Sequence, residues 1–525
     1  MDSTHAHESG HGHAAHEHSS AHSPVHAHSG LAAVEHSTHH SMAAASEKHV
    51  PRTLSEKIVS TIFSREGLFV ALIFLLAFIV RAHLMRYELF FEFDSYWHAR
   101  MVSYVLQGLP APMVDPLGYY HNMAAATLGS IPLFFWYVSA AIYKIFTLNG
   151  AYTLESWVLW VKILPALYGA LTSVAMYFLG KELFKGKNEH AAGLFAGFFA
   201  AIMPSFVYRT MGGFFEDDSF GFLWMVIGFV FFVRATRNPV WKKDKIVNAA
   251  LAGAGFALMA FAWSAFNQLV PVLIGVGVLQ FLVWVKEKEW GHANDYARLW
   301  GISFILFAIA ASLQSGTFWL AQFGGILGDL FLGTSEIVKW YHTAFFLVFI
   351  LAAVYGFFVA AKRGMVNEKT VQRIVSALFI LLILAPLIVT IFNVSLRTGD
   401  VLGQTVGEES DGKNFFGNKY SMLVLFAFIG IPAMGWLLIR KSRHYEFLTL
   451  PLVWLVVIFF MAWGKLKFTY YWGLPLALTA AVVLTLALTW MRSKSIPTQK
   501  LVVAGCGFMI LCGLAAGTLF VTQNV

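Results

Sequence analysis

The sequence predicts an all-α polytopic membrane protein with about 13 transmembrane helices, and three observations support this fold class. Of its 525 residues, 58% are hydrophobic and only 13% are charged, whereas about 25% of the residues in soluble domains are charged. Apolar windows of roughly 20 residues, enough to cross a bilayer as a helix, recur along the chain. The net charge of +8 comes from 37 Lys and Arg against 29 Asp and Glu. Most of these basic residues fall in every second loop, so we expect them to orient the chain in a membrane and not to bind nucleic acid.

The first 50 residues form a separate segment that is rich in His, Ala, Ser and Gly. They hold 13 of the 20 histidines and few large apolar side chains. Such a composition cannot bury enough surface to offset the entropy of ordering the chain, so residues 1–50 are predicted to be a disordered, His-rich tail. The tail lacks the apolar core of a secretory signal. Its scattered imidazoles would bind zinc, copper or nickel only weakly. Residues 51–66 follow as a basic cytosolic segment.

The remaining residues, 67–525, are predicted to form the membrane domain, and charge decides how many apolar windows cross the bilayer. If the apolar stretch 130–147 stays outside and the N-terminus is cytosolic, 25 of the 37 basic residues lie on the inner side. Counting this stretch as a span would move the basic loops outside, against the positive-inside rule. The C-terminus is then external, and the main external loops are 86–156 and 394–417. The thirteen predicted spans are 67–85, 157–180, 191–208, 218–233, 247–264, 267–285, 299–321, 340–361, 372–392, 418–439, 447–463, 468–490 and 501–521.

The same topology places three groups of carboxylates on the outer face. They lie in residues 91–100 (FEFDSYWHAR), 209–218 (RTMGGFFEDD) and 403–409 (GQTVGEE). The predicted spans hold no carboxylate at mid-depth, where ion-coupled transporters usually keep ionisable groups. We therefore expect chemistry at the outer membrane face.

The residue types in these groups are suited to binding a metal and a phosphate. Carboxylates separated by one residue, such as Glu216 and Asp218, can reach one hard cation, and Mg²⁺ or Mn²⁺ prefers such ligands. A metal there would neutralise a diphosphate as it leaves an activated sugar. Lys465 and Lys467 stand at the outer mouth of the twelfth span, where a lipid-linked phosphate would lie. The simpler interpretations are solvated acidic turns and lysines that snorkel to the interface. The prediction that the acidic groups and the two lysines lie on the same side of the membrane favours a metal- and phosphate-binding site over these simpler interpretations.

As an ordered set, these motifs resemble the catalytic subunit of oligosaccharyltransferase, a type C glycosyltransferase family with 13 spans and an internal N-terminus. The resemblance covers roughly residues 67–521. It implies that Asp94 is the metal- and acceptor-binding aspartate of the first motif. It also implies that Glu216 and Asp218, downstream of Arg209, form the second acidic motif.

Two further positions complete the resemblance. Glu408 matches the glutamate of a Ser/Thr-Ile/Val-x-Glu motif, because residues 405–408 read TVGE. The family's external arginine is most similar to Lys467, with Lys465 as the alternative, because one extra residue precedes Pro475. Lysine keeps the charge of arginine but lacks its planar fork. The resemblance implies a divalent metal, Mn or Mg, held by Asp94, Glu216, Asp218 and Glu408.

The implied activity is transfer of a glycan, with inversion, from a polyprenyl (dolichyl) diphosphate carrier to asparagine of acceptor proteins. Asp94 and Glu408 would accept hydrogen bonds from the acceptor amide, while Lys465, Lys467 and Arg209 would offset phosphate charge. The implied partners are a lipid-linked oligosaccharide, an acceptor polypeptide and membrane lipid. The implied location is a prokaryotic (archaeal) plasma membrane with the site facing outside, with the endoplasmic reticulum as the alternative.

One part of the family pattern is missing from this sequence. The family continues after its thirteenth span into a soluble external domain whose Trp-Trp-Asp-Tyr-Gly motif reads the Ser or Thr of the acceptor. This chain ends at Val525 and contains no Trp-Trp-Asp. Three explanations stay open: a separate chain supplies that domain, the domain was lost and the acceptor differs, or the sequence is truncated.

Two other function classes fit parts of the pattern. Another type C glycosyltransferase, which uses a lipid-monophosphate sugar and a hydroxyl or lipid acceptor, would share the fold and Asp94 but would not require Glu408. A metal transporter is suggested by the histidine tail. The spans, however, lack the mid-membrane pairs of His, Asp and Glu that transport would need.

Overall fold

The computed structural model describes residues 64–112, 133–186, 188–315, 340–392, 423–440 and 442–494, with four later positions. All of them belong to one unit, Ser60–Val525. The described residues form helices and no strand, so the predicted all-α class is confirmed. The tail 1–50, the loop 394–417 with Glu408, and most of the last predicted span lie outside the described residues.

Nine of the described helices, counted with their short extensions, are long and apolar enough to cross a membrane, and a tenth is obtained if one bent pair is a single span. Two further apolar helices, α13 and α17, also match predicted spans. The bounds are α2 (Arg65–Ala82), α5 (Leu154–Leu183), α6 (Glu189–Ile202), α7 (Pro204–Thr210), α8 (Asp217–Thr236), α9 (Lys243–Ala262), α10 (Leu269–Lys286), α11 (Trp290–Ser315), α13 (Trp340–Lys362), α14 (Glu368–Ile391), α17 (Val424–Arg440), α19 (Thr449–Gly464), α20 (Leu466–Tyr471) and α21 (Gly473–Ser493).

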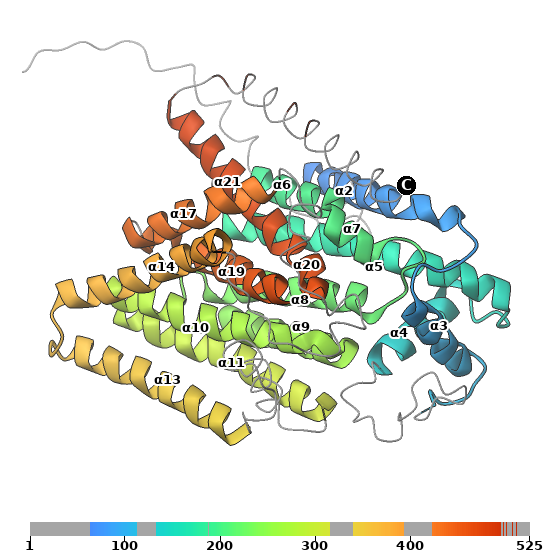
Figure 1. Cartoon of the computed structure of the whole chain (residues 1–525), viewed down its shortest axis with the longest axis horizontal. Helices are drawn as coiled ribbons and strands as arrows, with labels where there is room; N and C mark the ends of the chain where they lie inside the picture. Colours follow the sequence, from blue (N-terminus) through green and yellow to red (C-terminus); the bar gives the residue numbers. More distant parts are fainter. Residues whose placement is uncertain are drawn as a thin grey trace, which may run out of the picture. The chain divides into compact units, whose positions relative to one another are not determined.

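Short helices extend or join these elements. They are η1 (His83–Arg86), η4 (Ser264–Gln268), α18 (Ser442–Tyr445) and η9 (Glu446–Leu448). In Figure 1, α9, α10 and α11 run side by side, and α8 packs against α9. The α8–α9 packing is close because it uses glycines: a Cβ on Gly255 would lie 2.9 Å from the Cα of Gly228. Small residues of this kind let membrane helices approach each other at backbone distance.

The described parts of the predicted external loop 86–156 include two helices, α3 (Phe93–Leu106) and α4 (Leu133–Phe146), which lie together at the right of Figure 1. The 14 residues of α4 give a length of about 21 Å at 1.5 Å per residue. This is shorter than the roughly 30 Å of a bilayer core. The described part of this stretch is therefore shorter than a span, and its place outside the bilayer stays a prediction.

Polar side chains fix several helix starts. The Ser64 hydroxyl accepts a hydrogen bond from the N–H of Gly67 at 3.0 Å at the start of α2. Thr153 caps α5 in the same way, and the Asn367 side chain caps α14. Each cap satisfies a backbone N–H that has no partner within its helix.

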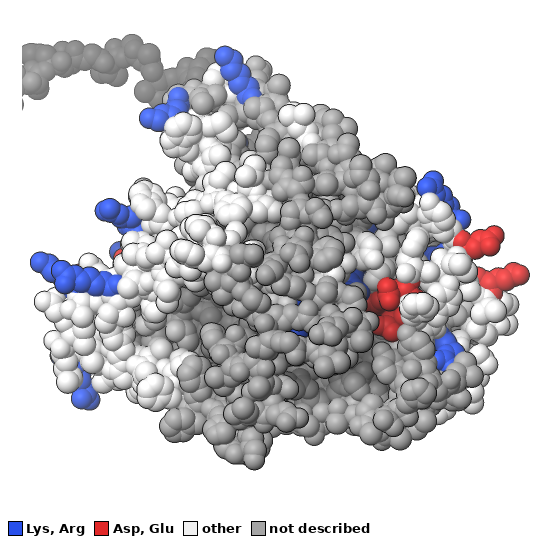
Figure 2. Space-filling view, viewed as in Figure 1, with Lys and Arg blue, Asp and Glu red and all other residues white. Residues whose placement is uncertain are grey.

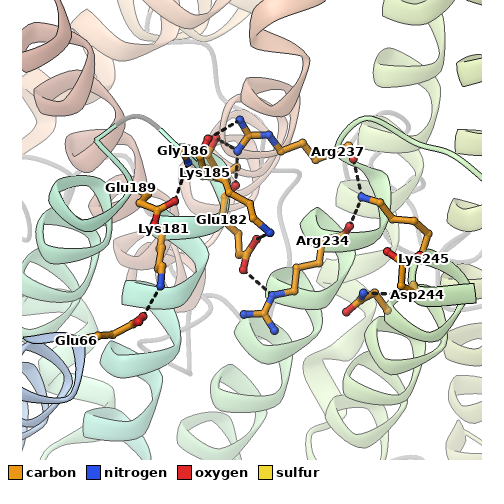
Figure 3. A network of polar contacts seen from close by, with 12 residues as sticks. Glu66, Lys181, Glu182, Lys185, Gly186, Glu189, Arg234, Arg237, Asp244 and Lys245 are labelled. Carbon is orange, nitrogen blue, oxygen red and sulfur yellow. Dashed lines mark hydrogen bonds and ion pairs between the residues drawn. The ribbon is translucent and has the colours of Figure 1, made fainter. Parts of the chain in front are cut away.

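Basic side chains close the opposite ends of helices that finish on the predicted inner side. Arg237 donates from Nη1 to the carbonyl oxygens of Glu182 at 2.7 Å and Leu183 at 3.0 Å, in the last turn of α5. Lys245 donates to the carbonyl oxygen of Arg234 at 2.6 Å, near the end of α8. An ion pair of 2.7 Å between Arg234 and Glu182 joins the two ends (Figure 3). Cations here complement the partial negative charge of the helix C-termini.

Candidate active site

Two acidic segments that are far apart in the sequence lie side by side. The backbone N–H of Phe215 donates to the Ser95 hydroxyl at 2.9 Å. The same two segments are also joined by a backbone hydrogen bond, in which the N–H of Phe91 donates to the carbonyl oxygen of Gly213 at 3.3 Å. Because Ser95 follows Asp94 and Phe215 precedes Glu216, the first and second predicted motifs adjoin each other.

Both acidic segments begin a helix. Asp94 lies in the first turn of α3, whose N-cap residue is Glu92. Glu216 is the N-cap residue of α8, and Asp218 lies in its first turn. Glu216 and Asp218 are buried, with 7% and 2% of their surface exposed. The partial positive charge at a helix N-terminus stabilises carboxylates in this position.

Arg209, at the end of α7, lies against the second acidic motif. Its Nη1 is 2.9 Å from Oε2 of Glu216, and its Nε is 3.8 Å from Oδ2 of Asp218. Only 3% of Arg209 is exposed. The guanidinium also lies over the rings of Phe214, at 5.0 Å, and Tyr470, at 4.7 Å. Arg209 therefore links the acidic pair to α20.

The basic pair is placed beside this cluster by α20. Lys465 is the N-cap residue of α20, and Lys467 lies in its first turn. The rings of Tyr208, on α7, and Tyr470 stack with centroids 5.1 Å apart. Because α20 packs on α7 through this stack, the predicted phosphate-binding lysines belong to the same region as Arg209.

Oxygen ligands for a metal are present in this region, but the described part of the chain does not assemble a full set. No group of three or more His, Cys, Asp or Glu side chains among the described residues is placed to hold a metal ion. Glu216 and Asp218 share Arg209, and Asp94 lies on the adjoining segment. The fourth predicted ligand, Glu408, lies outside the described residues. The donors are carboxylate oxygens, the type that Mg²⁺ and Mn²⁺ prefer.

Two tryptophans hold α3 in place, and sequence reasoning gave them no role. The indole N–H of Trp136, on α4, donates to Nδ1 of His98 at 2.8 Å. The indole N–H of Trp157, on α5, donates to the carbonyl oxygen of Ala99 at 2.9 Å. His98 belongs to the first motif, so its position in residues 91–100 was the only signal that could have pointed to this contact.

The visible surface shows where acidic side chains gather. In Figure 2, most of the visible Asp and Glu gather at the right-hand end, where α3 and α4 lie, and much of the visible Lys and Arg lies at the left and top. Lys and Arg also occur near the acidic end.

Comparison with known proteins identifies relatives of most of the chain. Residues 68–521 match the family described as oligosaccharyl transferase STT3, N-terminal. The chain is 21% identical over 434 residues to dolichyl-phosphooligosaccharide-protein glycotransferase 3 of Archaeoglobus fulgidus, which covers 75% of this chain and 46% of that protein. It is 24% identical over 223 residues to dolichyl-monophosphooligosaccharide-protein glycotransferase AglB of Haloferax volcanii, covering 39% of this chain and 19% of that protein. The matched part is less than half the length of either relative.

The fold is similar to that of solved oligosaccharyltransferases. The apo crystal structure of the Archaeoglobus fulgidus enzyme gives a TM-score of 0.59 at 17% identity, over 87% of this chain and 55% of that one. A complex of the same enzyme with zinc and sulfate gives a TM-score of 0.53 at 16% identity, over 86% and 52%. At this level of identity the likeness establishes a common fold.

Proposed function

Since this chain belongs to the oligosaccharyl transferase STT3 family, matching its N-terminal region, we propose that it is a membrane glycosyltransferase that modifies asparagine. The donor is a glycan on a polyprenyl (dolichyl) diphosphate carrier, and the acceptor is a polypeptide. The observation that carries this proposal is the meeting of three distant segments: the start of α3 with Asp94, the α7–α8 connection with Arg209 and Glu216, and α20 with Lys467.

The roles follow from what each reacting group needs. The amide nitrogen of asparagine is a poor nucleophile, because its lone pair is delocalised into the carbonyl group. Asp94 and Glu408 accept hydrogen bonds from its two N–H groups and orient it towards the anomeric carbon. Lys465, Lys467 and Arg209 offset the negative charge that develops on the departing phosphate. In-line displacement inverts the anomeric centre.

We further propose that Asp94, Glu216, Asp218 and Glu408 hold a divalent metal, Mn²⁺ or Mg²⁺. When bound, this ion supplies positive charge to the leaving phosphate. The support is the donor type and its placement, with carboxylates at two adjoining helix N-termini. Glu408 belongs to the loop 394–417, which lies outside the described residues.

The proposed topology has 13 spans, a cytosolic N-terminus, an external C-terminus and the site on the outer face. Its support is the positive-inside count together with the basic residues that cap helix ends on the inner side. The membrane is proposed to be an archaeal plasma membrane, with the endoplasmic reticulum as the alternative.

Asp94→Ala and Glu408→Ala test the assignment in membranes supplied with a lipid-linked glycan and a fluorescent acceptor peptide. Each variant should lower transfer by about 100-fold or more, because it removes a group that orients the acceptor. Glu155→Ala is the matched control, since Glu155 is an exposed carboxylate in the first turn of α5 and has no proposed role. Full activity in either site variant would overturn the assignment.

The carrier and acceptor are tested in the same preparation. Retained activity in Glu408→Gln, with Asp94 still essential, would favour the alternative enzyme that uses a lipid-monophosphate sugar and a hydroxyl or lipid acceptor. One of the relatives is named for a dolichyl monophosphate carrier, so monophosphate and diphosphate donors are both supplied.

A further inference from the structure

Arg81 is a fully buried cation in the last turn of α2 and has no part in the proposed chemistry. Its hydrogen bonds to the described residues all go to neutral oxygens. Nε donates to the hydroxyl of Thr210 at 2.7 Å, and Nη1 donates to the carbonyl oxygens of Ala77 at 3.0 Å and Ala201 at 2.9 Å. Nη2 donates to the carbonyl oxygen of Ala200 at 3.2 Å. Burying a charge costs free energy, so the structure must gain something from the hydrogen bonds between this guanidinium and the backbone carbonyls.

The reason is the break between α6 and α7, which are bent by 62°. In a continuous helix, the N–H of residue 204 would donate to the carbonyl of Ala200. Pro204 has no N–H, so that acceptor loses its usual partner. Unsatisfied carbonyls are costly in a membrane interior. The guanidinium of Arg81 supplies donors to Ala200 and Ala201 and thereby stabilises the break.

Arg81 also holds the far end of α7. The hydroxyl of Thr210, the last residue of α7, accepts the hydrogen bond from the Arg81 side chain. The backbone N–H of Gly212 donates to the carbonyl oxygen of Arg81 at 2.9 Å. Arg209, which contacts Glu216, lies between the two anchored ends of this segment. The side chain and backbone of Arg81 thus fix the end of α6, the end of α7 and the turn that leads to the acidic pair.

The neighbouring helix leaves space for this arrangement. A Cβ on Gly169, in α5, would fall on Nε of Arg81 and would lie 2.7 Å from the Cβ of Thr210. Any larger residue at position 169 would therefore displace the guanidinium. The absence of a side chain at Gly169 thus leaves the space that the Arg81 side chain occupies.

We propose that Arg81 is a positioning residue for residues 209–218. It fixes the broken α6–α7 element so that Arg209, Glu216 and Asp218 meet α3 and α20. Its effect on catalysis rests on the proposed function, whereas its effect on the position of the segment does not.

The test compares four variants of the full chain in lipid nanodiscs: Arg81→Met, Arg81→Lys, Thr210→Val and Thr172→Val. Thr172 provides the matched control. Both threonines are fully buried, and each hydroxyl donates to the carbonyl four residues earlier, at 2.8 Å for Thr172 and 2.7 Å for Thr210. Only Thr210 accepts from Arg81. The readouts are hydrogen–deuterium exchange of the peptide that covers residues 209–218, and kcat and KM for the acceptor.

Arg81→Met should speed exchange of this peptide about tenfold and Thr210→Val about threefold, because anchoring hydrogen bonds are lost. Arg81→Lys, which keeps the charge but not the fork, should fall between the wild type and Arg81→Met. Thr172→Val should stay within about twofold of the wild type. We expect kcat to fall in the same order and KM for the acceptor to change little.

Unchanged exchange in Arg81→Met, or equal exchange in Thr172→Val and Thr210→Val, would overturn the proposal. If exchange follows the expected order but the wild type transfers no glycan, the positioning role stands and the proposed function fails. If the wild type is active and exchange rises without loss of kcat, Arg81 holds the fold alone and the catalytic part of the proposal is wrong.

Discussion

His98 lies one turn after Asp94 on α3, and its surroundings keep the ring neutral. Burial lowers the pKa of the His98 imidazole to about 3. Its Nδ1 accepts the indole N–H of Trp136, so the proton of the neutral ring sits on Nε2. Protonation would remove this acceptor and place a charge among the rings of Phe135, Trp136 and Trp97. His98 is therefore suited to lock α3 against α4 and not to exchange protons with a substrate.

This arrangement predicts a loss of stability in mild acid. Below the ordinary pKa of 6.5, the unfolded chain takes up a proton that folded His98 does not. Each pH unit between about 6.5 and 3 then costs up to about 1.4 kcal/mol of unfolding free energy. His98→Gln should flatten the decline of the thermal midpoint between about pH 7 and pH 4.5. His83→Gln, at an exposed imidazole on η1, is the control, and identical slopes for wild type and His98→Gln would refute the claim.

Charged residues can be singled out from the sequence as candidates for a site, whereas the contacts that bring them together cannot be predicted from it. Asp94, Glu216 and Lys467 stand out because charge is rare in an apolar chain and is expensive to bury. Ser95 and Tyr470 join the segments, yet a serine or a tyrosine is unremarkable at any membrane interface. Their role depends on which distant residue the fold places opposite them. Glu408 stays a prediction, because it lies outside the described residues.

At the level of helices, hydropathy predicts where apolar segments lie but not how they break or extend. The predicted span 191–208 is wrong as a single helix, because Pro204 divides it into α6 and α7. The seventh span is predicted over residues 299–321, and the helix that contains its start extends further towards the N-terminus. Since helical hydrogen bonding continues beyond the apolar core, α11 already begins at Trp290. Within the predicted external loop, α4 coincides with the apolar stretch 130–147, whereas α3, with 14 residues, is too short for a span-length window to detect.

The capped end of α5 gives a prediction for a single helix. Arg237→Gln removes the charge and most of the donors that reach the carbonyls of Glu182 and Leu183. Because hydrogen bonds to charged groups contribute about 1.5–3 kcal/mol, we expect unfolding in SDS to begin at a lower detergent fraction. Arg363→Gln is the control, since Arg363 is exposed and lies in a loop that the proposed topology also places on the inner side. A similar shift in both variants would mean that net charge, and not capping, matters.

Across the whole membrane domain, the candidate site is built on the most deeply packed helices. In the apolar window of the span Arg443–Gly464, which includes α19, 83% of residues are buried, and in α8 78% are. The corresponding values are 22% for the span that contains α2 and 17% for α14. The acidic motif thus starts on a rigid central helix, and Lys465 directly follows another. Rigid elements position charged groups more accurately than loops do.

The topology predicts that two positions after the stretch 130–147 lie on opposite sides of the membrane, and both assignments depend on whether that stretch is a span. With this stretch outside the bilayer, residue 148 is external and residue 363 is internal; if it were a span, both assignments would reverse. After Cys506 and Cys512 are replaced by Ser, Leu148→Cys in intact cells should react with a membrane-impermeant maleimide. Arg363→Cys should react only after the membrane is opened. Both positions are exposed, so the absence of labelling would reflect the barrier and not burial. The reverse pattern would place the carboxylates of α8 on the cytosolic side and refute the outer-face site.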